Sequence, residues 1–255
     1  MTNPSFSLVG RRALVTGASR GIGEALAAGL AKAGADVAVA ARERSSLAVA
    51  QAAIEAAGRR SVAIAMDVRD AAAIRASVEA AAQALGGLDI LVNNAGVEEV
   101  RESLAVDEAL WDRIIDTNLK GAFFCAQAAA RVMAAGKGGC ILNLCSLTSE
   151  VGVPTAVPYG SSKSGLLGMT RALAAEWAGR AIRVNAIGPG YFRTDLTEVF
   201  YRDPAWQEAM LAKIPLRRFG RLEDLVGAAV FLCSDAAAYV TGQCLYIDGG
   251  YMASI

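Results

Sequence analysis

Short apolar runs alternate along this chain with longer stretches in which alanine and leucine recur at helical spacing. The short runs are apolar on both faces, which is typical of strands buried inside a parallel sheet, and the longer stretches fit the helices that connect such strands. The pattern predicts an α/β protein with a doubly wound parallel sheet of about seven strands and helices on both faces. We expect strands at residues 13–16, 37–41, 62–65, 90–93, 140–145, 183–187 and 244–247, and helices at 22–33, 45–57, 71–85, 107–135, 159–178 and 222–234.

The alternation breaks between residues 189 and 221. This stretch is long for a connection within a compact domain and carries several aromatic residues, which is typical of a binding loop or lid. A surface helical excursion that packs on itself is the alternative. The chain has 255 residues and shows no repeat or linker, so we expect a single domain over residues 1–255 with a substrate-binding loop or lid at about 189–221.

A glycine-rich turn joins the first expected strand to the first expected helix, where a dinucleotide-binding loop belongs. Its glycines follow the spacing Gly-x-x-x-Gly-x-Gly rather than the commoner Gly-x-Gly-x-x-Gly. Small residues let the backbone approach a pyrophosphate, and free N–H groups at the helix start attract its negative charge. An ordinary glycine-rich turn is the alternative while the motif is considered alone. The residues expected to contact a dinucleotide here are Gly17, Ser19, Arg20, Gly21, Ile22 and Gly23.

Tyr159 and Lys163 stand four residues apart in an expected helix, so their phenol and ammonium groups share one face. A nearby cation favours the phenolate and lowers the pKa of tyrosine from its ordinary value of about 10. A tyrosine with a lowered pKa can donate and accept a proton at neutral pH. Ser146 precedes this pair on the chain. Such a pair is common, and it gains meaning here from the dinucleotide motif at the other end of the chain.

With these motifs together, the chain resembles the short-chain dehydrogenase/reductase family from about residue 9 to residue 250. The resemblance implies a Rossmann-like domain that binds a nicotinamide dinucleotide and interconverts a secondary alcohol and a ketone. Two stretches, residues 188–195 and 214–220, also resemble sugar-acid dehydrogenases such as gluconate 5-dehydrogenases. The motifs appear in the family's order: the glycine loop, Asp67-Val68, Asn93-Asn94-Ala95-Gly96, Asn118, Ser146, Tyr159 with Lys163, and Pro189-Gly190.

The resemblance assigns a catalytic role to four side chains. Tyr159 would move the proton, and Lys163 would lower its pKa while binding the nicotinamide ribose. Ser146 would donate a hydrogen bond to the substrate oxygen and stabilise its developing charge. Asn118 would hold a water that relays protons to Lys163. Asparagine is unfavourable inside a helix, which supports a special role for Asn118, although a simple helix kink is the alternative.

The expected cofactor is NADP(H) rather than NAD(H). An NAD-binding chain usually has an acidic residue at the end of the second strand, and this chain has Ala41 there, followed by Arg42. Arg20 and Arg42 could clamp a 2′-phosphate, because guanidinium forks match phosphate oxygens. Arg42 at a solvated helix start is the alternative, and Glu43 is the residue that could favour NAD(H).

Further cofactor contacts are implied by the resemblance. Asp67 would contact the adenine, with a helix N-cap as its alternative role, and Asn94 could instead brace the central sheet. Thr194 would bond the nicotinamide carboxamide. The full set beyond the glycine loop and Arg42 is Asp67, Val68, Asn94, Ala95, Gly96, Tyr159, Lys163, Pro189, Gly190, Phe192 and Thr194.

The substrate is harder to infer than the reaction. We rank a sugar acid first and a small polyol or ketone beside it, and Arg193 or Arg217 could meet a carboxylate. The rivals are a 3-oxoacyl-carrier-protein reductase, suggested by Lys137 and Arg180, a broad ketone reductase, and a non-catalytic dinucleotide sensor. The expected substrate contacts are Glu98, Ser146, Thr148, Glu150, Tyr159 and Tyr191.

Composition narrows the remaining possibilities. Lys+Arg and Asp+Glu both number 25, which argues against a nucleic-acid surface or a polybasic membrane patch. No histidine is present, which excludes a Ser-His-Asp triad, and we expect no metal. The five cysteines form no C-x-x-C pair and fit buried thiols of a cytoplasmic protein. We expect no signal peptide and no membrane span. The family resemblance implies a homotetramer, paired through helices 107–135 and 159–178 and through residues 246–255.

Overall fold

A seven-stranded parallel sheet forms the centre of the computed structural model, which describes residues 5–194, 198 and 200–255. The strand order is β3-β2-β1-β4-β5-β6-β7. The doubly wound α/β fold predicted from the apolar pattern is confirmed, and each expected strand has its counterpart. The strands are β1 Arg12–Thr16, β2 Asp36–Ala41, β3 Ser61–Ala65, β4 Ile90–Asn93, β5 Gly139–Leu144, β6 Ile182–Pro189 and β7 Cys244–Ile247.

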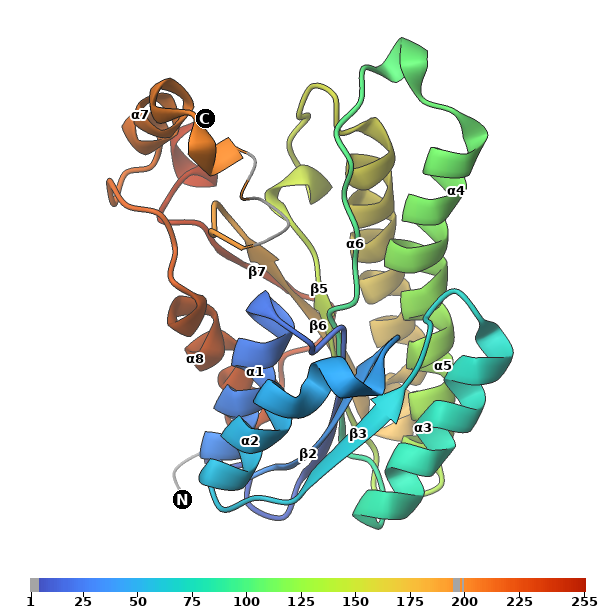
Figure 1. Cartoon of the computed structure of the whole chain (residues 1–255). Coiled ribbons are helices and arrows are strands. Elements are labelled where there is room, and N and C mark those ends of the chain that lie inside the picture. Colours follow the sequence, from blue (N-terminus) through green and yellow to red (C-terminus); the bar gives the residue numbers. More distant parts are fainter. Residues whose placement is uncertain (1–4, 195–197, 199) are drawn as a thin grey trace.

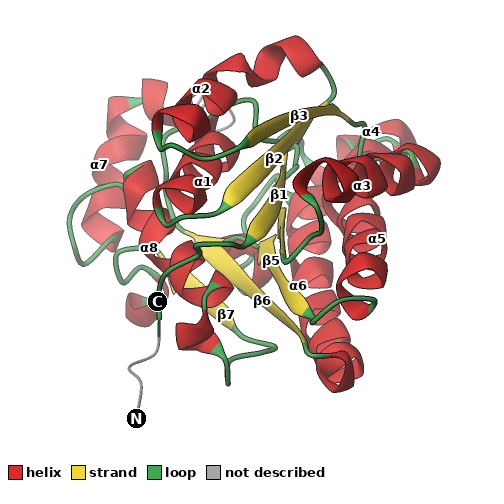
Figure 2. Ribbon diagram, turned by 90° about the horizontal axis from the view of Figure 1, so that it is seen from below, coloured by secondary structure: helices red, strands yellow, loops and turns green. Residues whose placement is uncertain are grey.

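Helices cover both faces of the sheet (Figure 1 and Figure 2). One face carries α1 Gly21–Lys32, α2 Ala48–Ala56 and α8 Leu222–Cys233. The other carries α3 Ala71–Leu85, α5 Gly121–Ala134 and α6 Val157–Trp177, with α4 Glu108–Ile115 against α6. Successive strand residues alternate between the two cores: Val15 packs in the first, and Leu14 packs in the second. Burial of both faces explains the continuous apolar runs of the sequence.

The strand order reverses direction at β1, which pairs with β2 on one side and with β4 on the other. In open α/β sheets, ligands bind in the crevice beyond the carboxyl ends of the strands at such a switch point. The glycine-rich turn follows β1, and Asn94 to Gly96 follow β4. The fold therefore brings two of the predicted cofactor motifs to one crevice.

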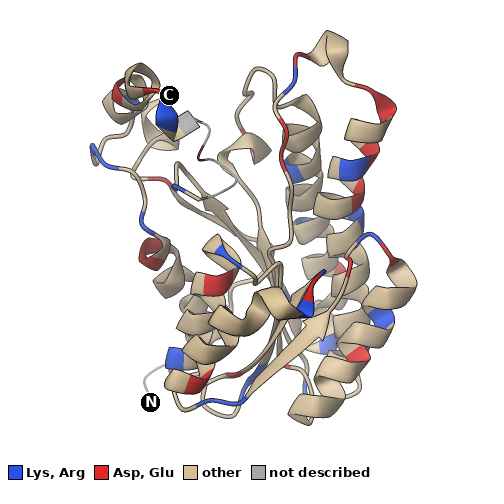
Figure 3. Cartoon of the chain, in the orientation of Figure 1, with Lys and Arg blue, Asp and Glu red and all other residues tan. Residues whose placement is uncertain are grey.

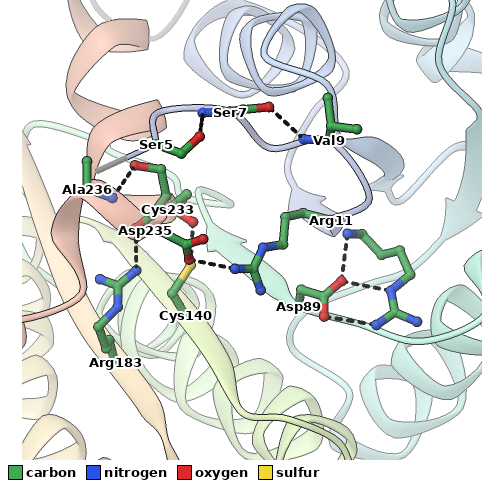
Figure 4. A network of polar contacts seen from close by, with 12 residues as sticks. Ser5, Ser7, Val9, Arg11, Asp89, Cys140, Arg183, Cys233, Asp235 and Ala236 are labelled. Carbon is green, nitrogen blue, oxygen red and sulfur yellow. Dashed lines mark hydrogen bonds and ion pairs between the residues drawn. The ribbon is translucent and has the colours of Figure 1, made fainter. Parts of the chain in front are cut away.

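The opposite, amino-terminal end of the sheet is tied by an ion pair. Asp89 accepts hydrogen bonds from Nε of Arg12 at 2.7 Å and from Nη2 of Arg12 at 2.9 Å. It also accepts one from the Arg12 backbone N–H at 2.9 Å. Figure 4 shows this pair beside a second contact, in which Arg11 donates to Asp235 at 2.6 Å. These bonds join the starts of β1 and β4 to each other and β1 to the segment after α8.

The stretch from 189 to 221 contains a helix that the sequence analysis missed. α7 spans Pro204–Lys213, preceded by a short 3-10 turn at Phe200–Arg202. Asp203 caps α7 by accepting a hydrogen bond from the backbone N–H of Ala205 at 2.9 Å. Part of this stretch is therefore helical, and its role as a substrate-binding loop or lid stays a prediction. Residues 195–197 and 199 of the predicted substrate loop lie outside the described residues.

Candidate active site

A cavity of about 700 Å³ opens at the carboxyl ends of the strands. Its lining includes residues from the glycine loop, from the ends of β2, β4 and β5, from α6 and from the segment after β6. Asn118 and Glu150 are the two predicted site residues that do not line it. Glu150 is exposed and contacts Arg171 at 3.6 Å. The predicted residues that line it are Gly17, Ser19, Arg20, Gly21, Ile22, Gly23, Arg42, Asp67, Val68, Asn94, Ala95, Gly96, Glu98, Ser146, Thr148, Tyr159, Lys163, Pro189, Gly190, Tyr191, Phe192 and Thr194.

The glycine loop is held tightly against the segment that follows β4. Gly17 has a φ of +65°, in the left-handed region that favours glycine. A Cβ added to Gly23 would lie 2.4 Å from the carbonyl oxygen of Gly17 and 2.4 Å from Nδ2 of Asn94. That Nδ2 atom donates to the carbonyl oxygens of Thr16 and Gly17, both at 2.9 Å. Asn94 therefore braces the glycine loop, whereas its neighbour Asn93 braces the sheet by donating to Oδ1 of Asn143 in β5.

Three arginines line the cavity at the end of β2. Arg20 and Arg42 were expected there, and Arg69 was not. Arg69 donates from Nη2 to Asp67 at 2.6 Å, and this bond is the main reason that the pKa of Asp67 lies below its ordinary value. Arg69 follows β3 closely, so the end of that strand was the sequence signal that could have found it. Ala41 ends β2 without an acidic side chain.

Asn118 lies in a π-helical turn, Asp116–Lys120, which interrupts the single helix expected over residues 107–135. Its Nδ2 donates to the Val97 carbonyl oxygen at 2.9 Å and to Oγ of Ser162 at 3.1 Å. Its Oδ1 accepts from the Val97 backbone N–H at 2.8 Å. The side chain thus positions two segments of the cavity wall, and the water relay assigned to Asn118 stays a prediction.

Ser146, Tyr159 and Lys163 meet at the floor of the cavity. Ser146 follows β5 and accepts a hydrogen bond at its Oγ from the Thr148 backbone N–H at 3.2 Å. Nζ of Lys163 lies 5.5 Å from the centre of the Tyr159 ring and donates to the Leu144 carbonyl oxygen at 2.6 Å. The i, i+4 spacing in α6 therefore places phenol and ammonium together, as the sequence predicted.

The expected lowering of the Tyr159 pKa is not found in the chain alone. Burial raises the pKa of Tyr159 most, Glu98 raises it further, and a hydrogen bond with Ser146 lowers it. Burial also lowers the pKa of Lys163. The physical reason is that the phenolate is costly in a cavity of low polarity, and the Lys163 ammonium is directed to the Leu144 carbonyl.

Part of the cavity wall is formed by aromatic rings. Tyr191 packs edge-on against Trp206 at 5.7 Å between ring centres, and Tyr201 packs against Trp206 at 5.3 Å. Tyr191, Tyr201 and Trp206 all line the cavity, and Tyr201 and Trp206 were not predicted as site residues. They come from the stretch that includes α7, so the aromatic content of the sequence there was the available signal.

Neither arginine suggested for a substrate carboxylate lines this cavity. Arg193 is exposed and contacts Glu198 at 2.7 Å. Arg217 donates to the Ala212 carbonyl oxygen at 2.9 Å, near the end of α7. Both guanidinium groups are directed to other partners, and a contact of either with a substrate carboxylate stays a prediction.

Comparison with known sequences gives consistent matches. A family model described as enoyl-(acyl carrier protein) reductase matches residues 17–252. Gluconate 5-dehydrogenase of Gluconobacter oxydans (strain 621H) is 41% identical over 256 residues, covering 100% of both chains. 3-Oxoacyl-[acyl-carrier-protein] reductase of Staphylococcus aureus (strain N315) is also 41% identical, over 94% of this chain and 97% of that protein.

Solved structures match equally well. A protein of Sinorhizobium meliloti 1021, provisionally assigned as a short-chain alcohol dehydrogenase, is 68% identical with a TM-score of 0.97, covering 99% of this chain and 100% of that one. A gluconate 5-dehydrogenase of Burkholderia cenocepacia J2315, in complex with NADP and tartrate, is 38% identical with a TM-score of 0.95 over 98% of each chain. The chain therefore belongs to the short-chain dehydrogenase/reductase family, and it is an oxidoreductase that acts on CH–OH groups. Within the described residues, no helix is long and apolar enough to span a membrane.

Proposed function

We propose that the chain interconverts a secondary alcohol and a ketone with NADP(H), on a sugar acid or small polyol as the first-ranked substrate class. The observation that carries this proposal is the convergence of Ser146, Tyr159 and Lys163 in the cavity that also holds the glycine loop. The bound nicotinamide supplies or accepts the hydride. The glycine loop lines this cavity at the start of α1, where backbone N–H groups attract a pyrophosphate.

The preference for NADP(H) is supported by charge at the adenosine end. Arg20, Arg42 and Arg69 line the cavity there, and Ala41 offers no carboxylate to ribose hydroxyls. Guanidinium groups match the oxygens of a 2′-phosphate. Three related structures are complexes with NADP, one from Burkholderia cenocepacia, one from Agrobacterium tumefaciens and one from Beutenbergia cavernae.

We assign the proton transfer to side chains of α6. For reduction, the Tyr159 hydroxyl donates its proton to the substrate oxygen, and the Ser146 hydroxyl donates a hydrogen bond to the same oxygen. The Lys163 ammonium stabilises the phenolate that remains. Asn118 keeps this geometry through Ser162, whose Oγ donates to the Tyr159 carbonyl oxygen at 2.7 Å.

The carrier-protein reductase alternative has weaker support from this chain. Lys137 and Arg180 stand just before the first residues of β5 and β6, at the amino-terminal end of the sheet. The cavity lies at the carboxyl end of the same strands. Within one chain, a partner held by these two cations would face away from the cavity. Positively and negatively charged residues are also interspersed along the helices (Figure 3), which fits a small-molecule substrate.

Assembly into a homotetramer in the cytoplasm is part of the proposal. All five cysteines are free thiols, which suits a reducing compartment. Trp111 of α4 and Val157 of α6 are exposed apolar side chains that subunit contacts could cover. Light scattering at micromolar concentration tests the assembly, and a monomer would contradict it.

Absorbance at 340 nm with purified protein tests the proposed reaction. NADPH and NADH are each offered with 5-ketogluconate, an acetoacetyl thioester and a few simple ketones. We expect NADPH turnover with 5-ketogluconate or a related hydroxylated ketone. A preference for NADH would contradict the arginine assignment, and turnover only with the thioester would favour the carrier-protein reductase.

A further inference from the structure

Glu98 places an acidic side chain beside the catalytic groups. It stands two residues after Gly96 and lines the same cavity as Ser146, Tyr159 and Lys163. Its charge acts on both titratable catalytic groups, since it raises the pKa of Tyr159 and opposes the effect of burial on Lys163. The backbone next to it is fixed, because Asn118 holds both the N–H and the carbonyl of Val97. A Cβ added to Gly96 would lie 3.8 Å from Nζ of Lys163, so the segment that carries Glu98 runs beside the catalytic groups.

This carboxylate is without a hydrogen-bond or ion-pair partner among the described residues. The next residue is the opposite case: Glu99 pairs with both Arg101 and Arg113. A half-buried carboxylate with no donor loses hydration without replacing it, which is unfavourable. A hydroxyl of the substrate would supply the missing donor.

Two neutral hydroxyl groups of the cavity wall also lack a hydrogen-bond partner. Oγ1 of Thr148 and the OH of Tyr201 are buried and have no hydrogen-bond partner. Tyr201 is 5% exposed, and both residues line the cavity. Like Glu98, they offer polar atoms of the cavity wall to the hydroxyls of a polyhydroxylated molecule.

Among the described residues that line the cavity, Lys163 is the cation that acts on Glu98. Arg113 is the other cation on this side of the cavity lining, and it is already paired with Glu99. Arg20, Arg42 and Arg69 line the adenosine end instead. A carboxylate next to the reacting carbon would therefore face the like charge of Glu98.

We propose that Glu98 selects the substrate, by accepting a hydrogen bond from a hydroxyl on a carbon next to the reacting carbonyl and by excluding a carboxylate there. This inference rests on the proposed function. It narrows the substrate to polyhydroxylated ketones in which any carboxylate is remote from the reacting carbon.

The test compares two isomeric sugar acids with NADPH. In 5-ketogluconate, hydroxylated carbons flank the ketone, and in 2-ketogluconate a carboxylate is attached to it. The comparison is made at about pH 8, because burial raises the pKa of Glu98 above its ordinary value. We expect kcat/KM of the wild type to favour 5-ketogluconate by at least about 100-fold, and Glu98→Gln to reduce this ratio by about 10-fold or more, because two like charges a few ångströms apart repel strongly.

Glu102→Gln is the matched control, since it removes an exposed carboxylate of the same segment outside the cavity, and it should leave the ratio unchanged. Thermal unfolding verifies that both variants are folded. If Glu98→Gln does not fold, the wild-type ratio still decides. Equal use of the two acids by the wild type, or an unchanged ratio in Glu98→Gln, overturns the role of Glu98 while the dehydrogenase stands. Turnover only with non-hydroxylated ketones also overturns the role of Glu98. No turnover of NADPH with any carbonyl overturns the proposed function itself.

Discussion

Nδ2 of Asn118 donates a 3.1 Å hydrogen bond to Oγ of Ser162, which joins the π-helical turn after α4 to the first turns of α6. Ser162 passes the link to the Tyr159 carbonyl oxygen, and Asn118 also holds both backbone polar groups of Val97. One asparagine thus links Tyr159 to the segment that carries Glu98. The π-helical turn is what directs its side chain to both, because an added residue shifts the helix face locally.

Asn118→Ala should lower kcat by about 10- to 100-fold, because small displacements of positioned groups are costly to catalysis. NADPH affinity should change little, since Asn118 does not line the cavity. Steady-state kinetics and a fluorescence titration with NADPH measure the two effects. Ser162→Ala removes one of the three bonds of Asn118 and should have a smaller effect in the same direction. Wild-type kcat in Asn118→Ala would show that this link is dispensable.

Arg42→Ala should weaken NADPH binding by about 10- to 100-fold, the loss expected when one hydrogen bond to a charged group is removed. NADH, which has no 2′-phosphate, should be affected far less. Arg44→Ala is a suitable control, because Arg44 is exposed and does not line the cavity. The ratio of kcat/KM for the two coenzymes gives the result. An unchanged ratio would assign the 2′-phosphate to Arg20 and Arg69 alone.

Gly23→Ala should impair cofactor binding, because the new methyl group would lie 2.4 Å from the Gly17 carbonyl oxygen. The cost of such overpacking is about 1–3 kcal/mol. A matched control is Gly227→Ala in α8, where no atom lies within 4 Å of the added methyl group. There the change from glycine to alanine should stabilise the helix by about 0.5–1 kcal/mol. Calorimetric titration with NADPH and thermal unfolding separate the two effects, and equal NADPH affinity in both variants would contradict the tight loop.

Asp89→Asn should lower the free energy of unfolding by about 1.5–3 kcal/mol at neutral pH, since it breaks charged hydrogen bonds to Arg12. Burial raises the pKa of Asp89, but the bonds from Arg12 outweigh it and the pKa is lowered. The stabilisation is therefore present above the unfolded pKa of about 4 and is lost as the pH falls through the lower pKa of the folded state.

Urea unfolding of the wild type and of Asp89→Asn at several pH values measures this loss. The difference between their free energies of unfolding should become smaller below about pH 4. Asp235→Asn is the control, because the ion pair between Asp235 and Arg11 is exposed. This pair should contribute only about 0–1 kcal/mol to the free energy of unfolding. A difference between wild type and Asp89→Asn that does not depend on pH would contradict the assigned pKa shift.

The sequence predicted the sheet well, because strands buried on both faces leave continuous apolar runs such as Leu14-Val15. It missed α7, whose apolar side chains are not arranged on one buried face. It also merged α4 and α5 into one helix, since a π-helical turn preserves helical spacing on both sides and has no sequence marker beyond Asn118.

The residues of the cavity were largely predictable, because they belong to motifs at strand ends. The direction of the pKa shift of Tyr159 was not predictable from the sequence. Spacing in α6 indicates that Lys163 is close to Tyr159, but not that burial outweighs it or that Glu98 adds a like charge. The partners of Arg193 and Arg217 also depend on how the segment around α7 folds, which no motif specifies.

Tyr159→Phe tests most directly whether the Tyr159 hydroxyl transfers the proton to and from the substrate oxygen. The variant keeps the ring and removes one oxygen. NADPH oxidation at 340 nm should fall by about 10²- to 10⁴-fold with the best substrate of the wild type, while the affinity for NADPH stays within a few-fold, since acid–base catalysis contributes at that scale. Near-normal turnover by a folded Tyr159→Phe protein would contradict the account.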